Sequence, residues 1–167
     1  MCQPPTRTCT IMILHFDIST QRILRECISQ TSLDLQAIRS RGNDASAVAD
    51  TIYQDWVMNE DNITDIYTPM EQIGATLCQR LHNKVESYAS GVDVVNIALC
   101  VSSVYNGVDS VIDSYLLHYY KNSLLAWWYS YRDTTLAEQY MMSAEDALQA
   151  LQTMVNSSKA KLTPHYF

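Results

Sequence analysis

The sequence contains little glycine and little proline, with four of each in 167 residues. An all-β protein of this length needs a turn about every ten residues, and such turns draw heavily on these two residue types. Their scarcity therefore favours helices. Because apolar residues make up 47% of the chain, enough for one hydrophobic core, we expect a single all-α domain over residues 1–167.

Basic residues are also few, at 11 Lys and Arg against 18 Asp and Glu, which gives a net charge of −7. No cluster of Lys and Arg stands out, so neither nucleic acid nor an anionic membrane surface is an expected partner. No run of eighteen apolar residues and no signal peptide is recognisable. These absences predict a cytoplasmic protein without a transmembrane anchor. Residues 159–167 offer no lipid-anchor motif and are expected to form a loose tail.

Motifs of catalysis and metal binding are missing as well. There is no G-x-S-x-G, no glycine-rich phosphate loop and no H-E-x-x-H, and the four histidines lack the spacing of metal ligands. The five cysteines are an odd number without a C-x-x-C pair, and three lie in apolar patterns typical of buried, reduced thiols. We therefore expect no enzyme activity, no cofactor and no metal site.

What the sequence does contain is apolar residues at helical spacing. This periodicity predicts at least six helices, among them 19–40, 45–58, 68–88, 92–104, 108–121 and 143–155. Within residues 1–18, whose structure is uncertain, the apolar run at 10–18 fits a strand or a helix equally well. The clearest start signal is Thr68-Pro69-Met70-Glu71, which has the pattern of a capping box.

Residues 92–104 differ because apolar side chains occur on nearly every side of the expected helix. Such a helix, too short to span a bilayer, belongs at the centre of a core. With the helix at 108–121 it would form a central hydrophobic hairpin. The aromatic stretch 122–133 would follow as another helix, with Trp127 buried against 92–104 and Trp128 half exposed. Asp133 would cap a further helix. The expected core residues are Val95, Leu99, Ile112, Leu124 and Trp127.

Three stretches, in this order, resemble the Bcl-2 family of apoptosis regulators and its short, divergent viral members: 68–91, 94–100 and 112–133. The first is similar to the entry into the fourth helix of the family and its homology region one. The second stands where the family has its central hydrophobic helix. In the third, Leu124 and Trp127 match a Leu-x-x-Trp pattern of homology region two.

The resemblance implies an all-α, Bcl-2-like helical bundle that inhibits apoptosis. A surface groove would hold the amphipathic homology-region-three helix of pro-apoptotic partners of the Bim, Bak or Bax type, in the host cytosol and peripheral to mitochondria. An exposed groove would also allow a homodimer. Core packing alone also explains the apolar stripe on 68–88, as it would in any bundle helix. The residues implied to contact the ligand helix are Ile52, Trp56, Met70, Ile73, Leu77, Leu81, Val85, Tyr88, Ser90 and Val92.

The chain departs from the family at the arginine that pairs with an aspartate of the ligand. No arginine lies between Arg80 and Arg132, and Ser90 occupies the equivalent place. Two alternatives therefore stay open. One keeps the fold but binds an innate-immune signalling adaptor through an outer face, and the other is a helical structural protein without a ligand groove.

Overall fold

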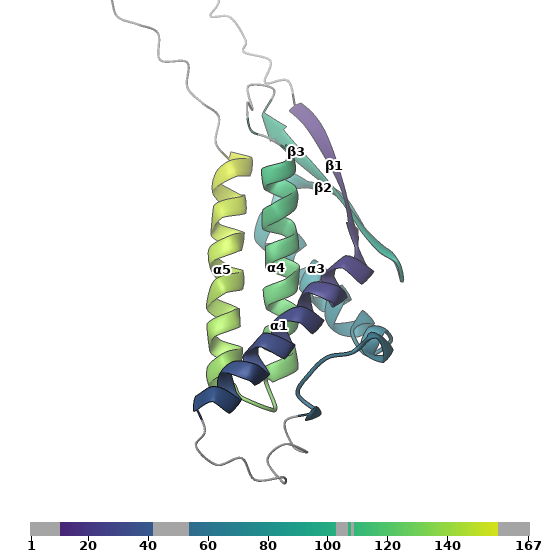
Figure 1. Cartoon of the computed structure of the whole chain (residues 1–167). Helices are drawn as coiled ribbons and strands as arrows, with labels where there is room; N and C mark the ends of the chain where they lie inside the picture. The colour runs from purple at the N-terminus through teal and green to yellow at the C-terminus, as the bar shows by residue number, and fades with distance from the viewer. Residues whose placement is uncertain (1–10, 42–53, 103–106, 108, 157–167) are drawn as a thin grey trace, which may run out of the picture.

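A computed structural model describes residues 11–41, 54–102, 107 and 109–156, and it places helices beside an antiparallel sheet (Figure 1). The prediction of an all-α bundle is therefore wrong, because residues 11–19, 85–90 and 94–102 form strands. The elements in chain order are β1 (Ile11–Ser19), α1 (Thr20–Arg41), the 3-10 turn η1 (Glu60–Ile63), α3 (Tyr67–Leu81), the 3-10 turn η2 (His82–Lys84), β2 (Val85–Ser90), β3 (Val94–Ser102), α4 (Asp109–Tyr129) and α5 (Thr134–Asn156).

The sheet has three strands in the order β1-β3-β2, so β3 lies in the middle. Its register pairs Ile18 with Val95 and Phe16 with Ile97 in antiparallel fashion. Residues 94–102 are thus a central strand and not the central helix that we expected. Val, Ile and Leu alternate along its helix-facing side, and β-branched residues favour strands. Its opposite face also carries the buried Ala98 and the partly buried Cys100, so the run is almost continuously apolar and its periodicity resembles that of a buried helix.

A central helix does exist, but it is α4. This helix runs without interruption from Asp109 to Tyr129 and therefore joins the two separate helices expected at 108–121 and 122–133. Its buried residues lie on most of its sides, because α1, α3, α5 and β1 all pack against it. In Figure 1, α4 stands between α5 and the sheet. The hydrophobic hairpin is accordingly formed by α4 and α5, and not by 92–104 and 108–121.

Local capping explains where α5 begins. The Asp133 carboxylate accepts a hydrogen bond from the backbone N–H of Leu136 at 3.0 Å, which satisfies a free amide of the first turn. This cap was predicted from the sequence. The expected start at residue 143 is wrong, because Ser143 lies inside α5 and donates to the carbonyl of Gln139.

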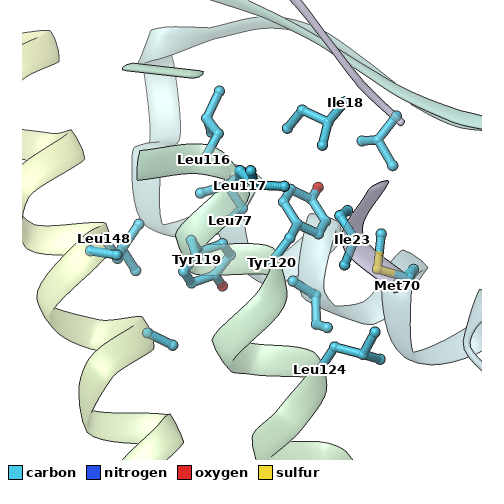
Figure 2. Packing of buried hydrophobic residues seen from close by; sticks show 14 of the residues in the cluster. Ile18, Ile23, Met70, Leu77, Leu116, Leu117, Tyr119, Tyr120, Leu124 and Leu148 are labelled. Carbon is cyan, nitrogen blue, oxygen red and sulfur yellow. The ribbon is translucent and has the colours of Figure 1, made fainter. Parts of the chain in front are cut away.

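The core fills the space between the inner face of the sheet and α4 and continues between α4 and α5 (Figure 2). Val95, Leu99, Ile112 and Leu124 are fully buried there, as predicted. The helix predicted at 19–40 is confirmed as α1, and β1 resolves the ambiguity at 10–18 in favour of a strand for residues 11–19. Residues 1–10 and the tail 159–167 lie outside the described residues.

Candidate functional site

Helix α3 forms one wall of the candidate site, and it begins differently from the prediction. Its N-cap is Ile66, no side chain caps it, and the first turn closes through the Met70 N–H to the Ile66 carbonyl at 2.9 Å. The predicted capping box is therefore wrong. Pro69 still lies in the first turn, where its missing N–H removes no hydrogen bond.

The apolar stripe of α3 turns mostly inward. Met70, Leu77 and Leu81 are buried in the core, and Figure 2 shows Met70 and Leu77 among residues of the neighbouring elements. Core packing, the alternative left open by the sequence, therefore accounts for these three side chains. Ile73 lies at the edge of the stripe, where it both contacts the core and lines a surface groove.

This groove has α3 and α5 as its walls and α4 as its floor, and its volume is about 340 Å³. Each helix contributes residues spaced by three or four positions, so one face of each points into the groove. Its surface is mostly apolar. The lining residues are Pro69, Gln72, Ile73 and Thr76 of α3, Tyr119, Ser123, Ala126 and Trp127 of α4, Ser130 of the following turn, and Met141 and Ala144 of α5.

Small side chains make the groove hollow. Ser123 and Ala126 on the floor and Ala144 on the wall leave space that larger residues would fill. Two of the hydroxyls at the groove already donate to backbone carbonyls: Thr76 to that of Gln72 at 2.9 Å and Ser130 to that of Trp127 at 2.7 Å. The groove therefore offers a mostly apolar surface in which these two hydroxyls do not require a polar ligand.

The two tryptophans exchange their expected roles. Trp127 is only half-buried and lines the groove. Trp128 is the buried one: its indole N–H donates to the Trp56 carbonyl at 2.7 Å, and the Arg132 guanidinium lies 3.8 Å from its ring centroid. The predictions of a buried Trp127 and a half-exposed Trp128 are wrong, because α4 continues through residue 127 and presents that position to the gap between α3 and α5.

Polar contacts fix the distance between the two walls at one end of the groove. Arg80 of α3 forms an ion pair with Glu145 of α5, and Gln152 of α5 donates to the Arg80 carbonyl at 3.0 Å. The first halves of α3 and α5, where the groove lies, are held apart by the side chains of α4. The groove is thus set by the packing of three helices.

The remaining predicted site residues lie elsewhere. Val85, Tyr88 and Ser90 belong to β2, and Tyr88 extends toward α3, since its hydroxyl lies where a β-carbon at Gly74 would be. Ser90 and Val92 line a separate hollow of about 290 Å³ together with Met70. Trp56 packs against the core, and Ile52 lies outside the described residues. The predicted residues are therefore divided between two hollows and the core.

A second polar feature was not predicted from the sequence. The Asp34 carboxylate of α1 accepts hydrogen bonds from the hydroxyls of Tyr129 at 3.0 Å and Tyr140 at 2.6 Å. The two rings stack with centroids 5.8 Å apart. Burial, followed by the nearby Asp34 charge and its hydrogen bond, raises the pKa of both phenols. This cluster joins three helices.

The described cysteines are free thiols, and burial raises the pKa of the Cys27 thiol to about 12. Within the described part of the chain, no group of three His, Cys, Asp or Glu residues could hold a metal ion. Among the same residues, no helix has both the length and the apolar character needed to cross a bilayer.

No protein-family model, no curated protein and no solved structure matches the chain.

Proposed function

We propose that this chain is a protein-binding domain whose groove between α3 and α5 receives the apolar face of an amphipathic helix from another protein. The groove itself supports this function. Its floor extends along α4 from Tyr119 to Trp127, which at 1.5 Å per residue is about 12 Å, or just over two helical turns. Recognition of a helix in a groove uses apolar anchors at i, i+3 or i+4 and i+7, a spacing that this length accommodates.

Exposure and charge further define the ligand. Met141 is 63% exposed at the groove wall, and methionine is an adaptable contact residue at binding surfaces. The chain carries a net charge of −7, so a ligand helix with basic residues on its polar face would be attracted to it. The proposed partner is therefore a helix with one apolar and one basic face.

For the identity of the partner, the sequence resemblance gives the more specific proposal. Residues 68–91 and 112–133 are similar to Bcl-2-family segments, and Leu124 and Trp127 match a family pattern. The stretch 94–100 forms a strand, as do residues 85–90 of the first stretch, and these parts give no support. A helix of a pro-apoptotic protein of the Bim, Bak or Bax type is therefore the first ligand to test, and its sequestration would inhibit apoptosis.

The test is calorimetric titration of the full chain with such peptides, a generic Leu/Lys amphipathic helix, and scrambled controls. We expect binding of at least one death-ligand peptide with a large negative heat-capacity change. Met141→Glu should weaken it at least about tenfold, which corresponds to roughly 1.4 kcal/mol. Met142→Glu is the matched control, since Met142 is equally exposed but does not line the groove.

The outcomes separate the two levels of the proposal. Binding of the generic helix alone would retain the groove and reject the pro-apoptotic ligand. Binding that Met141→Glu and Met142→Glu weaken equally would place the site elsewhere. An absence of binding by every peptide would reject both.

A further inference from the structure

Strand β1 forms an edge of the sheet, and its outward side has no strand partner among the described residues. The N–H of Thr20 donates to the carbonyl of Asp93 at 3.0 Å, which continues the register of β1 with β3. Hydrogen-bonded pairs recur at every second residue of an antiparallel ladder. The even-numbered residues of β1 therefore bond to β3. The odd-numbered residues, Ile11 to Ser19, direct their N–H and C=O groups outward.

Among the described residues, this edge lacks most of the features that normally prevent strand pairing. Natural edge strands are protected by lysine, proline, bulges or short length, whereas β1 has nine regular residues and neither lysine nor proline. Ile13 is a large apolar side chain of this strand and is 44% exposed, so pairing along the edge would cover it. By contrast, β2 at the opposite edge has six residues and a register irregularity between Val85 and Ser87.

We propose that β1 pairs antiparallel with β1 of a second copy of this chain, about a two-fold axis at Phe16. The two sheets then form one six-stranded sheet. Because β2 is protected, the pairing closes at a dimer with two-fold symmetry. This interface uses the sheet edge and is independent of the groove between α3 and α5.

Charge complementarity selects both the occupant and the register. His15 and Asp17 lie two residues apart and therefore on the same face of β1, and both are exposed. An axis at Phe16 places His15 of each copy opposite Asp17 of the other, which makes two symmetric imidazole–carboxylate pairs. An axis at Leu14 or at His15 would instead place Asp17 opposite Ile11 or Ile13. On the helix-facing side, the chosen register pairs Leu14 with Ile18 across the interface.

The first test is the mass of the full chain in solution by sedimentation equilibrium, where we expect a dimer. Ile13→Pro removes an outward N–H without removing a bond to β3, so this variant should be monomeric with an unchanged circular-dichroism spectrum. Ile13→Val retains the N–H and should stay dimeric. A monomeric wild-type chain, or a dimer that survives Ile13→Pro, overturns the proposal.

The second test determines the register and does not depend on proline. His15→Glu faces Asp17 of the second copy, and Asp17→Lys faces His15, so each change alone should raise the dimer dissociation constant at least about tenfold. The double variant restores opposite charges and should return the constant to within about threefold of the wild type. A double variant that dimerises no better than either single variant overturns the pairing about Phe16.

Discussion

Asp34 joins three helices through one carboxylate. It lies on α1, and its oxygens accept from Tyr129 at the end of α4, from Tyr140 of α5 and from Gln30 one turn away. Hydrogen bonds to a charged group contribute about 1.5–3 kcal/mol, more than those between neutral groups. The position of α1 across the end of the α4–α5 hairpin therefore depends on a few polar atoms as well as on apolar contacts.

Tyr140→Phe tests this cluster. The change removes the 2.6 Å bond to Asp34 and keeps the stacked ring, so we expect the free energy of unfolding to fall by about 1.5–3 kcal/mol in urea titrations. Tyr131→Phe is the matched control, because Tyr131 is 93% exposed and its removal should cost almost nothing. Equal effects of the two substitutions would mean that the cluster does not stabilise α1.

The same phenols predict a loss of stability at alkaline pH. Burial, followed by the contacts with Asp34, raises the pKa of Tyr129 and Tyr140, so the folded state holds protons that the unfolded state releases near pH 10. The free energy of unfolding that these protonated phenols contribute is fully present below about pH 10 and is lost as the pH rises above it. We expect Tm to fall above about pH 10, and less steeply in Tyr140→Phe than in the wild type. A wild-type Tm that is flat through this range would contradict the prediction.

The sequence predicts the helices and strands whose type is determined by nearby residues, and it fails for those whose type depends on distant contacts. The cap at Asp133 and the buried face of α1 are local, so the sequence alone predicts them. The strand at 94–102 is not local. Its apolar run fits either structure, and the choice depends on Phe16 and Ile18 of a strand far away in the sequence. Element type was therefore predicted for α1 and α3 and missed for β3 and for β2, whose residues 85–88 were expected to continue the helix that begins at 68.

The contact between α3 and β2 leads to a prediction at this scale. A β-carbon at Gly74 would lie 1.8 Å from the Tyr88 hydroxyl oxygen. Gly→Ala inside a helix normally stabilises by about 1 kcal/mol, but here we expect Gly74→Ala to destabilise by about 1–3 kcal/mol in urea titrations. In the background of Tyr88→Leu the same change should become neutral or stabilising. An unchanged penalty in that background would mean that Tyr88 is not the obstacle.

At the scale of the whole molecule, α4 is the structural centre. The sheet lies on one side of it, α5 on another, and α1 and α3 cover what remains (Figure 1). The sequence predicted a central apolar element but assigned it to the wrong segment. The groove was missed for a related reason: Tyr119, Met141 and Ala144 meet only after α3, α4 and α5 have packed. Their three- and four-residue spacings mark helical faces, but no spacing shows that two such faces leave a gap.

The sheet order has a consequence for how the chain acquires its fold during synthesis. β1 is synthesised before its partner β3, which follows only after α1, α3 and β2. Contacts between such distant segments form slowly, whereas the α4–α5 hairpin closes locally. Nascent chains on one messenger would therefore carry an unpaired apolar strand until β3 has been synthesised, a stage at which neighbouring copies can associate. We expect slower elongation to lengthen this exposure and to increase aggregation during synthesis.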